Sequence, residues 1–354
     1  MGGSGDLRTT TIPRDDRRTR RTGVRDRAIV LDRRAMDTGD ILRLSLLSPM
    51  TLSFVLGVGA TLLRSDLKFP DQIYTGLSIY LLFAIGMKGG AALAVSPFAD
   101  VATPAAASLA LGIAIPLWVY AALRRAGGFN GADAAALAAH YGAVSSVTFI
   151  AALAYVQRLG MPAEGFMPAM LPIMDVTSIV VGLSLAREAR AGGAWRGALR
   201  EILAGRSILL LGGGLAIGFL AGPEGYKSVA PFFSDPFQGA LCLFLLDLGM
   251  VAAHRFKDAR KVGPFLVTFA IAAPLVNGTA GVVAGWAAGL SVGGATVLGT
   301  LAASASYIAA PAAVRLALPA ANPGYYLTAA LAITFPFNLV IGLPLYAALS
   351  RLLS

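Results

Sequence analysis

The sequence is poor in the residues that build disulfide frameworks and transition-metal centres. It has one cysteine, Cys242, and two histidines, His140 and His254. A single cysteine excludes a disulfide within the chain. One cysteine and two histidines are also too few ligands for the site of a transition-metal enzyme. Charged residues are also scarce, at 14%, whereas soluble domains carry roughly 25%. The composition therefore argues against a soluble enzyme.

The chain is rich in long hydrophobic segments. Hydrophobic residues make up 56% of it, and the mean hydropathy is +0.70. Because a helix needs about 20 apolar residues to cross a bilayer, we predict an all-α polytopic membrane protein with ten transmembrane helices. They are expected near residues 45–62, 73–95, 104–123, 133–157, 166–186, 207–222, 236–254, 264–288, 294–316 and 325–349.

The N-terminal tail differs from the rest of the chain. Residues 1–35 hold ten arginines and five acidic residues, which supply +5 of the net charge of +10. A segment with so little apolar content is expected to be disordered. It also has no apolar core of a signal peptide. We expect Met36 to be the functional start and the tail to lie outside the mature protein.

The two halves of the chain echo each other. Three pairs of segments start 158, 160 and 163 positions apart: SVTFIAA at 146–152 with SASYIAA at 304–310, VVGLSL at 180–185 with VIGLPL at 340–345, and GM at 86–87 with GM at 249–250. Five predicted spans precede the loop at 187–206 and five follow it. An odd number of spans turns the second half upside down. Residues 36–186 and 207–354 are therefore predicted to be inverted repeats, as in many secondary transporters.

Positive charge in the short loops predicts the orientation. Loops that follow odd-numbered spans carry 14 Lys and Arg residues, whereas the opposite side carries three. Because Lys and Arg are enriched on the cytoplasmic side, the loop at 187–206 is expected to be cytoplasmic and both termini extracytoplasmic.

Two predicted spans contain clusters of small and hydroxyl residues at mid-membrane depth. We predict that the fourth and ninth helices are discontinuous there, because the N-terminal ends of half-helices can hold a small anion. The alternative is that these hydroxyls bond to carbonyls within ordinary helices. The candidate substrate-binding residues are Gly142, Ser145, Ser146, Thr148, Ala303, Ser304 and Ser306.

Ionisable residues inside spans are functional candidates, since a charge at the bilayer centre costs about 2.5–3.5 kcal/mol on insertion scales. Asp175 and Asn338 each follow a proline in matching spans. With Ser304 they are the predicted Na⁺ ligands, and a structural hydrogen bond is the alternative for both. Lys88 and Asp247 are expected to have a structural or coupling role, pairing with each other.

Two further polar residues have weaker claims to the site. His140 lies near a predicted span end, where an interfacial position is expected. Asn277 is expected to make a structural cap or pair.

The residues support a family resemblance. The motifs are IGMKGG at 85–90, YGAVS at 141–145, PIMDV at 172–176, ASASYIAAP at 303–311 and PAANP at 319–323. Over residues 37–353 the chain resembles the sodium-dependent bicarbonate transporter family. This resemblance implies Na⁺-coupled uptake of bicarbonate across the bacterial inner membrane, with Na⁺ as the coupling ion and no cofactor. It also implies a fold similar to bile-acid/sodium symporters, an elevator-type core that moves against a scaffold, and a homotrimer in the bilayer.

The chain departs from the family pattern in three places. One is the motif around Lys88, since the family tends to carry its lysine about one turn earlier, where this chain has Ala84. Tyr307 stands where the family carries an acidic residue, which affects either the ion site or the substrate. The loop at 187–206 is short, so binding of a PII-like regulatory protein there stays an open expectation.

Other functions remain open. One alternative is a symporter of another small anion, such as a carboxylate, driven by Na⁺ or H⁺. A channel is a second. An intramembrane enzyme with Asp175 and Asp247 as an acid dyad is disfavoured, because the predicted spans contain no Gly-x-Gly-Asp motif.

Overall fold

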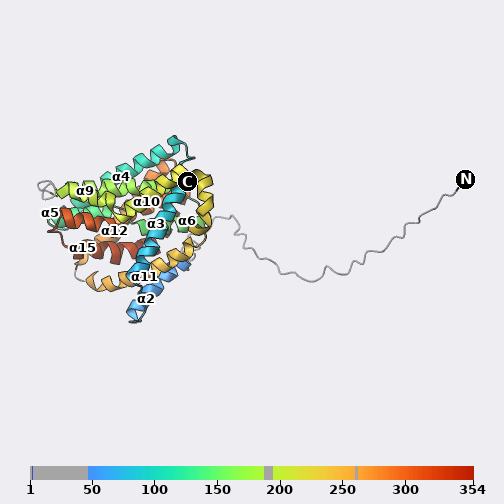
Figure 1. Ribbon diagram of the computed structural model, residues 1–354. Coiled ribbons are helices and arrows are strands. Elements are labelled where there is room, and N and C mark those ends of the chain that lie inside the picture. The colour runs from blue at the N-terminus through green and yellow to red at the C-terminus, as the bar shows by residue number, and fades with distance from the viewer. Residues whose placement is uncertain (1, 3–46, 187–193, 260–261) are drawn as a thin grey trace. The chain divides into compact units, whose positions relative to one another are not determined.

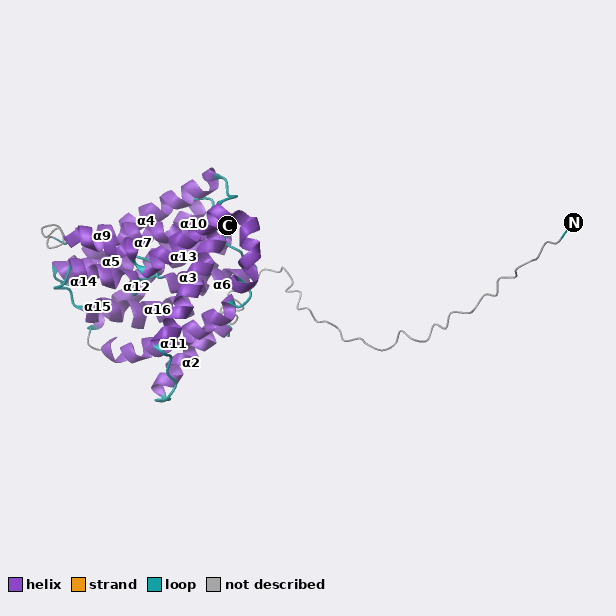
Figure 2. Cartoon of the chain, viewed as in Figure 1, coloured by secondary structure: helices purple, strands orange, loops and turns teal. Residues whose placement is uncertain are grey.

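Helices account for all the regular structure in the part of the chain that the computed structural model describes, namely residue 2 and residues 47–186, 194–259 and 262–354 (Figures 1 and 2). The expected tail at 1–35, apart from Gly2, and Met36 lie outside these ranges. Eight of the described helices are long and apolar enough to span a membrane, and Pro49–Leu62 and Val292–Ala303 are shorter apolar helices. The prediction of an all-α polytopic membrane protein is confirmed.

The first half contains α2 (Pro49–Leu62), α3 (Asp71–Leu93), α4 (Phe98–Arg125), α5 (Gly131–Gly142), α6 (Ser146–Arg158), η1 (Met167–Ala169) and α7 (Met170–Ser184). The second half contains α9 (Ala194–Ala204), α10 (Arg206–Phe233), α11 (Phe237–Ala259), α12 (Pro264–Ala287), α13 (Val292–Ala303), α14 (Ala309–Ala317), α15 (Pro323–Leu327), η2 (Thr328–Thr334), α16 (Phe335–Phe337), η3 (Asn338–Gly342) and α17 (Leu343–Leu353). The segments η2 and η3 are wide π-helical turns, a geometry that often occurs at functional sites.

One group of helices is held together by glycine contacts. Helix α3 packs along α10, and α2 packs along α11. At Gly214 of α10, a Cβ atom would lie 3.0 Å from the Gly86 Cα atom, so the two backbones touch. In the second pair, Gly57 faces the Leu246 carbonyl and Gly249 faces the Phe54 carbonyl. Small residues permit this approach in membranes, where van der Waals packing drives association.

The remaining long helices form a second group in which the same packing occurs twice. Helices α4, α5 and α7 contact one another, and so do α12, α13 and α17. The hydrophobic window in Gly131–Arg158, which contains α5 and α6, is 94% buried, whereas that of α10 is 22% buried. The α5–α6 segment is therefore the interior of the molecule, and α10 lies at its outside.

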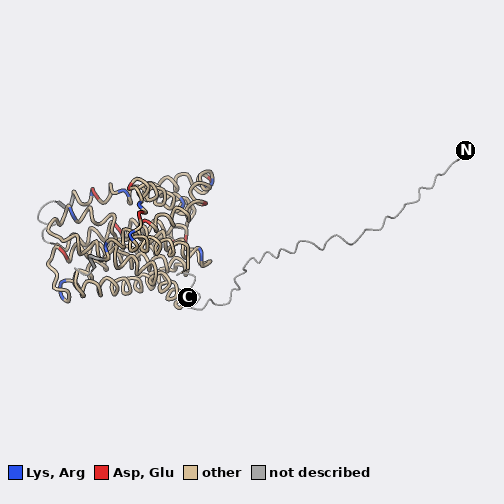
Figure 3. Tube along the Cα trace, turned by 90° about the horizontal axis from the view of Figure 1, so that it is seen from below, with Lys and Arg blue, Asp and Glu red and all other residues tan. Residues whose placement is uncertain are grey.

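The outer surface suits lipid. Leu209 is 63% exposed and Leu220 is 84% exposed on α10, and charged residues are sparse along the helical body (Figure 3). An apolar surface of this kind is stable against hydrocarbon and unstable against water.

The glycine contacts give a direct test of the packing. Gly218→Ala is expected to lower the free energy of unfolding by about 1–3 kcal/mol, because the new methyl group overlaps the Met87 carbonyl. Gly213→Ala, on the same helix with no atom within 4 Å of an added Cβ, should leave stability unchanged. Thermal denaturation of the purified protein in detergent measures both, and equal midpoints for the two variants would contradict the packing.

Candidate ion and anion site

Two helices are interrupted in the buried middle of the molecule. Helix α5 ends at Gly142 and α6 begins at Ser146, with Ala143 in an extended conformation (φ −74°, ψ 149°). Helix α13 ends at Ala303 and α14 begins at Ala309. The interruptions predicted in the fourth and ninth helices thus occur at residues 143–145 and 304–308. Figure 1 shows α5 and α6 at opposite sides of the bundle.

The two interruptions bond to each other. The Ser145 amide donates to the Ser304 hydroxyl at 2.9 Å, and the Ser306 amide donates to the His140 carbonyl at 2.8 Å. The Ser304 hydroxyl in turn donates to the Leu301 carbonyl. Backbone groups freed inside a membrane must find partners, because water is absent. The crossing of the two segments supplies these partners.

A serine hydroxyl accepts a hydrogen bond from the first turn of each half-helix that leaves the crossing. The Ser145 hydroxyl accepts from the Thr148 amide at 3.2 Å, and the Ser306 hydroxyl accepts from the Ala310 amide at 3.3 Å. Helix N-termini carry partial positive charge. The arrangement therefore directs two positive helix ends at one place.

A small hollow adjoins both helix ends. It is lined by Val144, Ser145, Ser146, Ser207, Ser306, Tyr307, Ile308 and Ala309, and it is too narrow for a water-sized sphere. The Tyr307 hydroxyl faces Ser145 but makes no well-aligned hydrogen bond. Ser207 comes from α10, and no sequence pattern placed it here. Its position in the first turn of a span, at the end of the 187–206 loop, gave no signal of a site.

Asp175 and Asn338 each form a hydrogen bond with the backbone at one of the two interruptions. The Asp175 carboxylate accepts from the Val144 amide at 3.2 Å, and the Asn338 amide group donates to the Ala303 carbonyl at 2.8 Å. Both side chains are buried, at 1% and 0% exposure. The Tyr346 hydroxyl lies 3.2 Å from the Asn338 side-chain oxygen. Carboxylate, amide and carbonyl oxygens are ligands suited to a hard cation such as Na⁺.

The other predicted substrate-binding residues also lie at or beside the crossing. Gly142 ends α5, and a Cβ there would meet Pro116 and Ser178, so its lack of a side chain permits close packing. Ser146 lines the hollow, the Thr148 amide donates to the Ser145 hydroxyl, and the Ala303 carbonyl accepts from the Asn338 side chain.

The expected interfacial position of His140 is wrong. His140 is 0% exposed, its Nδ1 atom lies 2.7 Å from the Ala136 carbonyl, and its ring stacks on Tyr326 at 4.2 Å. It sits in the last turn of a half-helix, and that half-helix ends inside the molecule. Asn277 accepts from the Trp118 indole at 2.8 Å, which confirms the expected structural pair.

The expected pair of Lys88 and Asp247 is not formed. Asp247 interacts with Tyr74 and Asp71 at the start of α3. Lys88 lies 14 residues beyond Tyr74 on the same helix, or about 21 Å along its axis at 1.5 Å per residue. The sequence offset matched the two helices, but it does not determine how far along each helix the charged residue lies.

The comparison with known families agrees with this architecture. The family model of the Na⁺-dependent bicarbonate transporter superfamily matches residues 49–351. The chain belongs to this family. Membership makes it a transporter and not an enzyme, and its dependence on Na⁺ and use of bicarbonate are properties that the family name carries. No curated protein matches the chain at a significant level.

Ser304→Ala tests whether the crossing is a structural unit. The change removes the acceptor of the Ser145 amide, and a buried amide without a partner costs about 1–3 kcal/mol. The midpoint of thermal unfolding is therefore expected to fall. Ser184→Ala, which removes an exposed hydroxyl bonded only to its own helix turn, is the matched control. A Ser304→Ala protein as stable as this control would show that the cross-bond contributes nothing.

Proposed function

We propose that this protein is a secondary active transporter that couples the inward movement of Na⁺ to uptake of bicarbonate across the bacterial inner membrane. The observation that carries the proposal is the crossing of two interrupted helices, whose serine-capped N-termini face one hollow. Family membership supports the same substrate and ion.

The anion is proposed to bind at the two N-terminal helix ends. Bicarbonate is a small planar anion whose oxygens accept hydrogen bonds from amides and hydroxyls. Ser145, Ser146 and Ser306 surround the hollow with such donors. Fixed dipoles at helix N-termini can stabilise an anion without a lysine or arginine.

The cation is proposed to bind beside the anion, to Asp175, Asn338 and Ser304. Asp175 brings a negative charge to the interruption of one helix, and Asn338 brings an amide oxygen to the other. A buried charge is stable only when it is paired and hydrogen-bonded. Na⁺ and bicarbonate would therefore enter together, since each offsets the other.

Movement is proposed to occur between the two helix groups. The glycine-packed group of α2, α3, α10 and α11 would be the scaffold, and the group that contains the crossing would be the mobile core. Ser207 of α10 borders the hollow, so the site lies where the two groups meet. A relative displacement can open such a site alternately to each side.

The membrane arrangement completes the proposal. We assign ten spans in two inverted repeats, with α5–α6 as the fourth and α13–α14 as the ninth. Loop charge places 187–206 in the cytoplasm and both termini outside. A homotrimer follows from family resemblance. Part of the 187–206 loop lies outside the described residues, and the binding of a PII-like partner there stays an expectation.

Asp175→Asn tests the coupling. The asparagine oxygen can still accept from the Val144 amide, so folding should persist while the negative charge is lost. The Na⁺ concentration for half-maximal bicarbonate uptake is expected to rise about tenfold or more, equivalent to about 1.4 kcal/mol. Asp66→Asn is the control, because Asp66 is exposed in the loop between α2 and α3 and takes no part in the crossing. Equal Na⁺ dependence in both variants would exclude Asp175 as a ligand.

Transport in liposomes tests the function itself. Uptake of ²²Na⁺ should require bicarbonate and should not be supported by chloride. Acetate and larger organic acids test the alternative carboxylate substrates, and an imposed pH gradient without Na⁺ tests proton coupling. Bicarbonate uptake that is unchanged when Na⁺ is removed would refute the proposal.

A further inference from the structure

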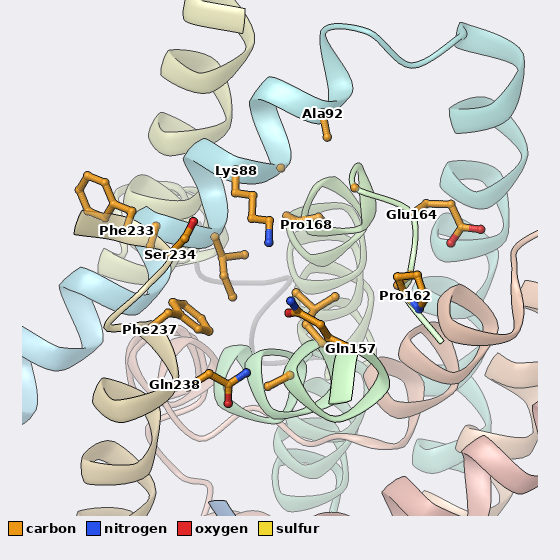
Figure 4. A pocket seen from close by; sticks show the side chains of 17 residues that line it. Lys88, Ala92, Gln157, Pro162, Glu164, Pro168, Phe233, Ser234, Phe237 and Gln238 are labelled. Atoms are coloured by element: carbon orange, nitrogen blue, oxygen red, sulfur yellow. The ribbon is translucent and has the colours of Figure 1, made fainter. Parts of the chain in front are cut away.

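A cavity of about 320 Å³ lies apart from the crossing. Its walls come from α3, the last two turns of α6, the segment 162–168, and the junction of α10 with α11. Figure 4 shows the Lys88 side chain reaching into this space, with Phe233 and Phe237 on one side and Pro168 on another. One cationic group thus occupies a largely apolar cavity.

Lys88 has no anionic partner in the cavity. Its ammonium group takes part in none of the ion pairs or side-chain hydrogen bonds found among the described residues. Glu164 is the one carboxylate in the cavity wall, and it is committed elsewhere: its Oε1 atom accepts from the Ser291 amide at 2.6 Å. Figure 4 shows that carboxylate turned away from Lys88. The positive charge is therefore uncompensated.

The other polar groups of the wall are neutral donors. They are the amides of Gln157 and Gln238 and the hydroxyl of Ser234, and Figure 4 shows them in the wall of the cavity that the Lys88 side chain enters. A cation surrounded by neutral donors and by apolar walls attracts a small anion, because low-dielectric walls focus its field.

The cavity is connected to the crossing by a single helix. Gln157 lies near the C-terminal end of α6, whereas Ser146 at its other end borders the hollow. A separation of 11 positions along the helix corresponds to about 16.5 Å. Under the proposed orientation, the end of α6 that carries Gln157 faces the cell exterior.

We propose that this cavity is an external anion-capture site in which Lys88 draws small monoanions from outside before they reach the crossing. Its role in transport rests on the proposed function, but the binding of an anion at Lys88 does not. The site takes one small oxyanion or carboxylate, held by the ammonium group and the side-chain amides.

Direct binding is tested by chemical protection in the full-length purified protein. Lysines are reductively methylated with formaldehyde and a borohydride reagent, and mass spectrometry follows each site. Bicarbonate or formate should slow methylation of Lys88 at least twofold and in a saturable way, because a paired ammonium group loses its proton less readily. Lys227, which is exposed and already paired with Glu224, is the internal control and should not respond. Equal protection of both lysines, or of neither, would overturn the proposal.

Substitutions that remove or keep the charge at Lys88 test the role of the cavity in uptake. Lys88→Gln should raise the KM for the external anion about three- to tenfold with kcat unchanged, since one partly screened charge is lost. Lys88→Arg should retain the low KM, and Lys227→Gln should resemble the unaltered protein. Loss of kcat in Lys88→Gln, or failure of arginine to substitute, would contradict capture. Protection of Lys88 by the anion, without Na⁺-coupled uptake, would refute only the proposed function. Na⁺-coupled uptake without protection of Lys88 would refute only the capture site.

Discussion

The structure depends on satisfying backbone groups where no water can reach them. Each interrupted helix frees amides and carbonyls in the buried middle of the molecule, and each free group there is unfavourable by several kcal/mol in a lipid environment. Hydrogen bonds between the two interruptions satisfy several of these groups. Ser145 donates to Ser304, and Ser306 donates to the carbonyl of His140. Asp175 and Asn338 then supply one further partner to each segment.

This constraint also explains why the halves of the chain resemble each other. Of the recurring serines, Ser304 bonds across the crossing and Ser146 lines the hollow beside it, so both copies serve the same junction. The recurring Gly-Met pair has a different cause. Gly86 and Gly249 allow close contact with α10 and with α2, which builds the second helix group. The glycine-packed group thus consists of tightly packed helices, whereas the other group contains interrupted helices with free backbone polar groups. The candidate site lies between the two groups.

Much of this was visible in the sequence because it follows from local composition. Apolar length located the spans, and hydroxyl clusters located the interruptions at Ser145 and Ser304. Positional offset paired Asp175 with Asn338. Contacts between distant parts of the chain could not be predicted from local composition. Ser207 lines the hollow from another helix, and Tyr307 lines it from the turn before α14.

The errors have a physical origin as well. The expected position of His140 assumed that a helix end lies at the membrane surface, yet α5 ends inside the molecule. The pairing of Lys88 with Asp247 assumed that equivalent helices place their charges at equal depth. Span edges shifted too, since α10 continues past Gly222, where φ of 66° marks a kink. The helix α9 was not foreseen within the loop at 187–206.

The most direct test of the account is a cryo-electron microscopy map of the protein in Na⁺ and bicarbonate, compared with one in K⁺ and chloride. The account predicts density for an anion between the N-terminal ends of α6 and α14, with density for a cation beside Asp175, in the first map alone. Bicarbonate density bound elsewhere, with the crossing unchanged between the two maps, would contradict it.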